Sequence, residues 1–120
     1  MITNKFYKLG KEKLYTINRS ITGNGVRKTL KIIKREFPKL KIIEVKSNQK
    51  VFDWRIPSEW NVKSAYVLDK NKKKIIDFKN HNLHLVNYSM AMKKIIQKKE
   101  LIKRLYSLPN KPNAIPYVTS

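Results

Sequence analysis

The sequence predicts an α+β fold: two N-terminal helices, a small antiparallel β-rich domain, a short helix and an extended Pro-rich tail. Three observations predict it. Apolar residues before Pro38 recur at the three- and four-residue spacing of amphipathic helices. After Pro38 the apolar spacing changes to the two-residue alternation that is typical of strands. Near the end, three prolines within eight residues exclude regular structure, because proline and the residue before it resist both helix and sheet.

The two helical patterns occupy the first part of the chain. Residues 5–18 can form a helix, although Gly10 weakens it. Its expected buried positions are Phe6, Leu9, Leu14 and Ile17. A turn at residues 22–25 then begins a second helix, which Thr22 or Asn24 can cap and which Pro38 ends. The apolar stripe of this second helix consists of Val26, Leu30, Ile33 and Phe37.

The strand patterns follow Pro38. Residues 40–46 are expected to form a strand that ends in a polar turn at residues 47–50. Residues 51–56 alternate, which predicts a second strand whose packed face is made by Phe52, Trp54 and Ile56. The remaining expectations are strands at 65–69 and 74–78 around a hairpin turn at 70–73, a strand at 83–88, and a helix from about 97 to 106 with Leu101, Leu105 and Leu108 on one side.

Composition excludes several kinds of active site. The chain has no cysteine, so it has no disulfide, no thiolate zinc ligand and no thiol nucleophile. It has no apolar run of the ~18 residues that a membrane span needs, and no secretory apolar segment at its start. A soluble cytoplasmic protein is therefore the expectation.

Net charge is the strongest compositional signal. The chain holds 28 Lys and Arg against 8 Asp and Glu, which gives a net charge of +20. A selected surface for nucleic acid or another polyanion is one interpretation. Compositional drift toward Lys, Ile and Asn, as in AT-rich genomes, is the favoured one, because bidentate phosphate contacts and base readout use Arg more than Lys.

The one histidine pair, His81 and His84, is the first candidate site. On a helix the two side chains would share a face and could bind a metal. The surrounding pattern is strand-like, however, which predicts opposite faces for them. The favoured interpretation is that His81 lies in a turn and that His84 faces the packed or semi-polar side of a sheet.

The other candidates carry less specific signals. Residues 22–25 could bind an anion through backbone N–H groups, although a cap and tight turn is favoured and the segment is no Walker loop. Asp53 and Glu59 could form an acid–base pair, but their spacing specifies no geometry. Lys and aromatic residues interleave at residues 5–8, as in some single-strand binders. Ser20, Ser58 and Ser64 are the serines that a His and an Asp could activate, an arrangement common by chance.

Four blocks in one order resemble a known family. They are residues 19–27, residues 51–54 with 57–61, residues 76–78 with 82–85 and 88–89, and residues 108–112 with 114–120. Together they resemble the N-terminal part of an aminopeptidase-like family of bacterial proteins, which are regarded as zinc-dependent exopeptidases. The resemblance covers the chain from about Leu14 to Ser120 and is more specific than any single motif above.

The resemblance implies a fold and a place in a larger protein. Family members are several times longer, with an α/β exopeptidase-like core that binds zinc through His and carboxylate ligands and with an inserted β-rich domain of unknown role. Residues 1–39 are then the helical start of that core, residues 40–92 the inserted domain, and residues 93–120 a helix and extended segment returning to the core. The family's ligands follow the last block, so we expect no catalytic, metal-binding or cofactor-binding residue in this sequence.

These implications give three candidate functions. The favoured one is an N-terminal fragment of an aminopeptidase-like zinc hydrolase, inactive alone, that contributes scaffold and the inserted domain to the rest of the parent polypeptide. The alternatives are a basic module for nucleic acid or another polyanion, and a structural or interaction remnant that associates with itself or another chain. No membrane partner is expected, and zinc is expected only in the full-length parent.

Overall fold

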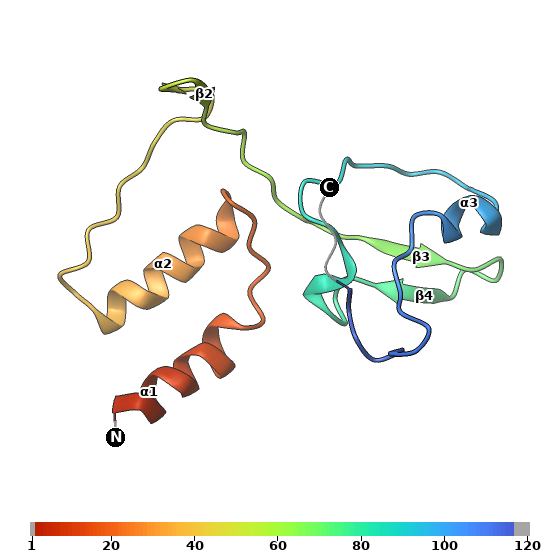
Figure 1. Ribbon diagram of the computed structural model, residues 1–120, viewed down its shortest axis with the longest axis horizontal. Coiled ribbons are helices and arrows are strands. Elements are labelled where there is room, and N and C mark those ends of the chain that lie inside the picture. Colours follow the sequence, from red (N-terminus) through yellow and green to blue (C-terminus); the bar gives the residue numbers. More distant parts are fainter. Residues whose placement is uncertain (1, 117–120) are drawn as a thin grey trace. The chain divides into compact units, whose positions relative to one another are not determined.

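The structure of this protein is a computed structural model that describes residues 2–116 (Figure 1). It divides into two compact units, Met1–His84 and Leu85–Ser120. Helices and two small antiparallel sheets are present in the described residues, so the expected α+β class is confirmed. The expected domain boundaries after residues 39 and 92, and the α/β core of a longer parent, stay predictions.

The first helix is α1, Ile2–Lys8, which continues directly into a wider π-helical turn, η1, Leu9–Leu14. The wider turn closes where the N–H of Tyr15 donates to the carbonyl of Gly10 at 2.8 Å. The helix expected at residues 5–18 is therefore present, but it begins earlier and ends at Leu14. Its expected inner positions are at best half-buried in the described structure.

The second helix, α2, Asn24–Glu36, is present as expected and ends before Pro38, but it begins within the expected turn at residues 22–25. The N–H of Phe37 still donates to the Ile33 carbonyl at 3.0 Å, and Pro38, which has no N–H, ends the helix. Phe37 stacks on Phe6 of α1 with ring centroids 5.5 Å apart. An ion pair at 2.7 Å joins Lys5 to Glu36 beside this stack. The last residue of the expected apolar stripe, Phe37, therefore contacts α1.

The strand expected at residues 40–46 is wrong, because this segment forms no ladder in the described structure. Its alternating sequence fits an extended chain, but a strand also needs a neighbour that accepts and donates its backbone hydrogen bonds. The polar turn expected after it is present at Ser47 and Asn48.

The single strand expected at residues 51–56 is also wrong. The chain folds back in its middle and forms a hairpin of β1, Lys50–Val51, and β2, Trp54–Arg55, in which Val51 pairs with Trp54. Phe52, with φ at 53°, and Asp53 form the two-residue turn between them. Phe52 is 90% exposed and Trp54 is 51% exposed, so the expected packed face does not exist here.

The hairpin expected around residues 70–73 is confirmed. Strands β3, Tyr66–Leu68, and β4, Lys74–Asp77, pair antiparallel with an irregular step after Val67. The Asp69 carboxylate accepts the N–H groups of Asn71 and Lys73 at 2.8 and 2.9 Å, which fixes the turn. In β4 the ammonium of Lys74 lies 2.8 Å from the Asp77 carboxylate and 4.7 Å from the centre of the Tyr66 ring.

The strand expected at residues 83–88 is replaced by a short 3₁₀ helix, η2, Asn82–His84, and by turns. Tyr88 has φ at 63°, which strand geometry does not allow. The N–H of His84 donates to the His81 carbonyl at 3.1 Å and that of Ser89 to the Val86 carbonyl at 3.3 Å. These local hydrogen bonds replace the ladder that the apolar alternation predicted.

The Leu85–Ser120 unit contains α3, Lys98–Ile102, a shorter helix than the one expected at 97–106. Turns without helix or strand follow as far as residue 116, as the prolines predicted, and the expected extension at residues 117–120 lies outside the described residues. No apolar side chain of the described residues is fully buried. No helix among them is long and apolar enough to cross a membrane.

Candidate functional site

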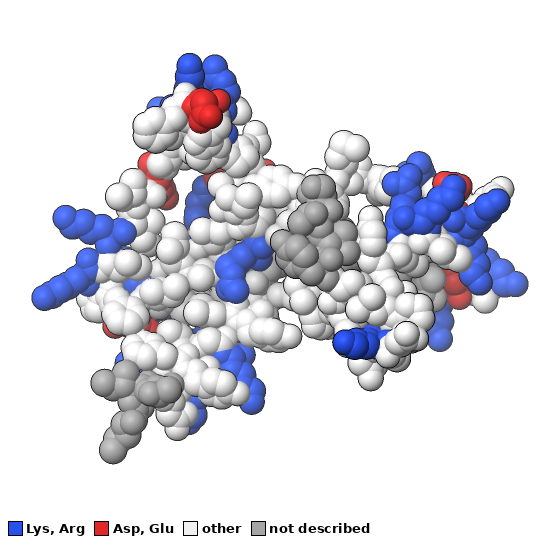
Figure 2. Space-filling model, in the orientation of Figure 1, with Lys and Arg blue, Asp and Glu red and all other residues white. Residues whose placement is uncertain are grey.

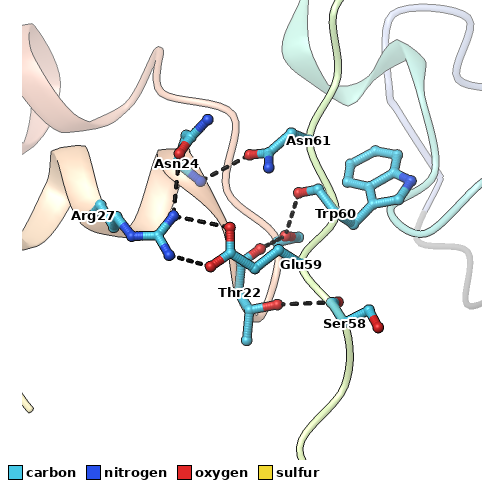
Figure 3. Close-up of polar contacts among 8 residues, drawn as sticks. Thr22, Asn24, Arg27, Ser58, Glu59, Trp60 and Asn61 are labelled. Atoms are coloured by element: carbon cyan, nitrogen blue, oxygen red, sulfur yellow. Dashed lines mark hydrogen bonds and ion pairs between the residues drawn. The ribbon is translucent and has the colours of Figure 1, made fainter. Parts of the chain in front are cut away.

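The densest group of polar contacts surrounds the start of α2 (Figure 3). The segment before and within the first turn of α2 meets the segment that follows β2, about 37 residues later in the chain. We call this group the clasp. One side consists of Ser20, Thr22, Asn24 and Arg27, and the other of Ser58, Glu59, Trp60 and Asn61.

Asn61 supplies the cap of α2. Its side-chain oxygen accepts the backbone N–H of Asn24 at 2.8 Å. Gly23 is the N-cap residue and makes no side-chain cap, so the expected capping by Thr22 or Asn24 is wrong. An acceptor distant in sequence therefore satisfies one of the N–H groups that the start of a helix leaves open.

Two hydroxyls add further contacts across the clasp. The Ser20 hydroxyl donates to the Trp60 carbonyl at 3.2 Å and also to the Thr22 carbonyl. The Thr22 hydroxyl donates to the Ser58 carbonyl at 3.4 Å, a long bond. The turn expected at residues 22–25 is confirmed only in part: the chain bends at Thr22 and Gly23, whereas Asn24 and Gly25 already belong to α2. The N–H of Asn24 is bonded within the protein.

Arg27 and Glu59 form the charged part of the clasp. Both terminal guanidinium nitrogens of Arg27 donate to the Glu59 carboxylate, one of them at 2.9 Å. The guanidinium also donates to the side-chain oxygen of Asn24 at 3.1 Å. The hydrogen bond from Arg27 lowers the pKa of Glu59 below its ordinary value, and Glu59 in turn raises the pKa of Arg27. A carboxylate also suits this place because the start of a helix carries partial positive charge.

Two glycines allow the segments to approach this closely. A Cβ at Gly23 would lie 2.7 Å from the Trp60 carbonyl oxygen and 2.9 Å from the Asn61 side-chain oxygen. A Cβ at Gly25 would overlap the carbonyl of Asn18. Only glycine therefore fits at both positions without moving backbone.

A shallow hollow of about 140 Å³ lies beside the clasp. Its lining is amide, hydroxyl and indole groups with no charged side chain: Asn18, Ser20, Asn24, Gly25, Trp60, Asn61 and Val62. The hydroxyl and the capping amide are already bonded within the protein. The arrangement stabilises the local fold and contains no nucleophile paired with a base.

The structure brings His81 and His84 together, contrary to the expectation of opposite faces. Their ring centroids lie 5.6 Å apart because η2 places residues three apart on one side. Nδ1 of His81 accepts the N–H of Leu83, and Nδ1 of His84 lies 3.1 Å from the Asp77 carbonyl. Among residues 2–116, no group of three or more His, Asp and Glu side chains could hold a metal.

The other candidate residues make structural contacts or lie apart from one another. Glu59 pairs with Arg27, whereas Asp53 lies in the β1–β2 turn, so the two do not form an acid–base pair. The Ser20 hydroxyl donates to backbone carbonyls. In the basic aromatic segment, the Phe6 ring stacks within the protein. Figure 2 shows Lys and Arg side chains at many places on the visible face, with few acids among them.

Comparison with known proteins now defines the class. The described fold is an α+β module in which a clasp joins the start of α2 to the segment that follows β2. Residues 59–120, just over half of the chain, match the family described as "Domain of unknown function (DUF2172)". The chain belongs to this family.

Two relatives place the module in longer proteins. The chain is 51% identical over 109 residues to a Clostridium acetobutylicum protein named "Putative polysaccharide biosynthesis protein with aminopeptidase-like domain", covering 91% of this chain and 25% of the relative. It matches a crystal structure of a "putative peptidase" from Clostridium acetobutylicum with a TM-score of 0.90 and 49% identity, covering 99% of this chain and 28% of that one. The resemblance to aminopeptidase-like proteins is therefore confirmed, and the chain spans about a quarter of the length of these relatives.

The clasp gives a first prediction. Replacing Asn61 with Ala removes the acceptor for the Asn24 N–H, and we expect a loss of about 1 kcal/mol in the free energy of unfolding, as for other lost caps. Asn61→Asp is the control that keeps an acceptor at the helix start. Both variants are compared in the Glu59→Gln background, because Asn61 also hydrogen-bonds Glu59 and a second carboxylate would be repelled by it. Urea denaturation of both variants measures the effect. Equal destabilisation by Ala and Asp would show that the cap contributes nothing.

The Arg27–Glu59 pair gives a pH-dependent prediction. Because the pKa of Glu59 is lower in the folded state, the pair contributes stability above the ordinary glutamate pKa, and this contribution disappears as the pH falls through the lowered value. We therefore expect wild type to be more stable than Glu59→Gln at pH 7 and the difference to shrink steadily as the pH falls below the ordinary glutamate pKa of about 4.3. Thermal unfolding from pH 7 to pH 3 measures it. A difference that stays constant with pH would contradict the role of the charge.

Proposed function

We propose that this chain is a structural module of an aminopeptidase-like hydrolase and that residues outside the given sequence carry out the hydrolysis. The match to the crystal structure supports this most strongly: nearly the whole of this chain superposes on a minor part of a peptidase-named protein at 49% identity. Such a level of identity over 99% of the chain indicates the same structural role in both proteins.

Zinc is the metal that the family resemblance implies, and the described residues do not fit it. A catalytic zinc site uses three protein ligands and an open position. His81 and His84 offer two imidazoles, and one ring nitrogen of each already contacts the backbone. The proposed zinc ligands therefore lie in the rest of the hydrolase.

The clasp indicates what the module contributes. It fixes the start of α2 against the segment that leads from the β1–β2 hairpin to β3. The β1–β2 hairpin lies in the chain between α2 and residues 58–61, and the clasp joins the two ends of this stretch. We propose that the module presents a rigid support to the hydrolase and takes no part in bond cleavage.

A chimaera tests the proposal. The part of the Clostridium acetobutylicum relative that matches this chain is replaced with the present sequence, and a panel of aminoacyl 4-nitroanilides is offered to the chimaera, the unmodified relative and the isolated chain. We expect similar hydrolysis by the first two and none by the isolated chain. Hydrolysis by the isolated chain would contradict a purely structural role, and no hydrolysis by the unmodified relative would contradict the hydrolase assignment.

A further inference from the structure

Residues 90–96 of the Leu85–Ser120 unit form an open segment between Ser89 and α3. The segment has no helix or strand, and Figure 1 draws the chain leading into α3 as a long ribbon without a tight turn. Among the described residues, no backbone hydrogen bond involves its N–H or C=O groups. We call residues 90–96 the docking segment.

The docking segment exposes large apolar side chains. Met90 is 91% exposed, Met92 is 59% exposed and Ile95 is 103% exposed. Single apolar residues on a surface are ordinary, but three within six residues of one open segment mark a surface that another structure covers. Methionine suits such a surface because its flexible side chain fills irregular apolar gaps.

Charge indicates the chemistry of the opposite surface. Lys93 and Lys94 lie between the apolar side chains, and Lys98 and Lys99 follow at the start of α3. Within residues 90–103 the described structure has one ion pair, between Lys103 and Glu100. The four other lysines are thus available to carboxylates, so a fitting surface is an apolar depression with an acidic rim.

We propose that the docking segment binds the part of the longer aminopeptidase-like polypeptide that lies outside this sequence, and this rests on the proposed function. Most of the peptidase-named chain lies outside its match to this protein, so a covering surface is available within one polypeptide. The open N–H and C=O groups allow the segment to add to the edge of a sheet. The alternation of an added strand places Met90 and Met92 on one side, where they enter apolar pockets, and Ile95 on the other.

Photo-crosslinking in the chimaera described above tests the proposal. Met92→p-benzoylphenylalanine places the probe on the same side as Met90, and Lys93→p-benzoylphenylalanine is the control one residue away, on the opposite side of an added strand. We expect the probe at position 92 to crosslink within the same polypeptide to the peptidase part, with several-fold lower yield at position 93. The absence of a crosslink at position 92, or a crosslink to a second molecule that doubles the mass, would overturn the proposal.

Amide hydrogen exchange gives an independent measurement. We expect the amides of residues 91–96 to exchange slowly in the chimaera and rapidly in the isolated chain, and Met90→Ser with Met92→Ser and Ile95→Ser to restore rapid exchange. Equal rates in the chimaera and the isolated chain would contradict docking. The two proposals fail differently. An active chimaera without crosslink or slowed exchange would refute docking alone. Slowed exchange in a chimaera that is inactive, as is the unmodified relative, would refute the hydrolase assignment and leave docking in place.

Discussion

Replacing Gly25 with Ala should prevent the first turn of α2 from adopting its present position. The new Cβ would overlap the backbone carbonyl of Asn18, which no side-chain rotation can relieve. Overpacking of this kind costs about 3 kcal/mol, because backbone must move on one side or the other. Arg27 and Asn24 would move with the helix start and lose their partners across the clasp. We therefore expect Tm to fall by more than about 10 °C.

Gly10→Ala is the matched control for this change. Gly10 also lies in a helical segment, but a Cβ there meets no atom within 4 Å. Alanine forms helix better than glycine, so this variant should be unchanged or up to about 1 kcal/mol more stable. Thermal unfolding followed by circular dichroism compares the two. Similar Tm values for the Gly25 and Gly10 variants would mean that the close contact with Asn18 does not exist in solution.

Replacing Gly23 with Ala should have the second large effect, for two separate reasons. Gly23 has φ at 126°, a conformation that costs an L-residue about 1–3 kcal/mol. Its Cβ would also lie too close to the Trp60 carbonyl and the Asn61 side chain. Because both costs act on the residue that precedes α2, we expect a lower midpoint of urea denaturation and loss of the Asn61 cap.

A double variant separates the two causes. Asn61→Ala removes the side-chain atoms of Asn61 that the new Cβ would meet and leaves the Trp60 carbonyl, so Gly23→Ala should cost less in the Asn61→Ala background than in wild type. The remaining cost reports the backbone conformation and the Trp60 carbonyl. Strictly additive free energies of unfolding would show that the Asn61 side chain is not in contact with residue 23.

Helix patterns predicted the fold better than strand patterns did. The spacing of Val26, Leu30 and Ile33 and the stop at Pro38 predicted α2 and its end before Pro38, since an α-helix makes its hydrogen bonds within its own segment. The strand at 40–46 failed because a strand depends on a distant partner. The strand at 51–56 failed because alternation continues through a two-residue turn, and a positive φ at Phe52 is uncommon for an aromatic residue.

For the clasp, too, the sequence predicted the local features and missed the contacts between distant residues. The sequence marked residues 22–25 as a turn and residues 57–61 as part of a family block, but it did not connect them. Nothing in the spacing indicates that Asn61 caps α2 or that Glu59 pairs with Arg27. The presence of two glycines and an Asn around the start of a helix was the one available signal that another segment approaches there.

By itself, the sequence determined the α+β class, the helix α2, the β3–β4 hairpin and the relation to aminopeptidase-like proteins. These depend on local spacing, turn chemistry and blocks of identity. Only the tertiary structure decided the clasp and the exposure of the docking segment. The physical reason is that caps, ion pairs and burial are made between residues far apart in the chain, whose meeting no local pattern encodes.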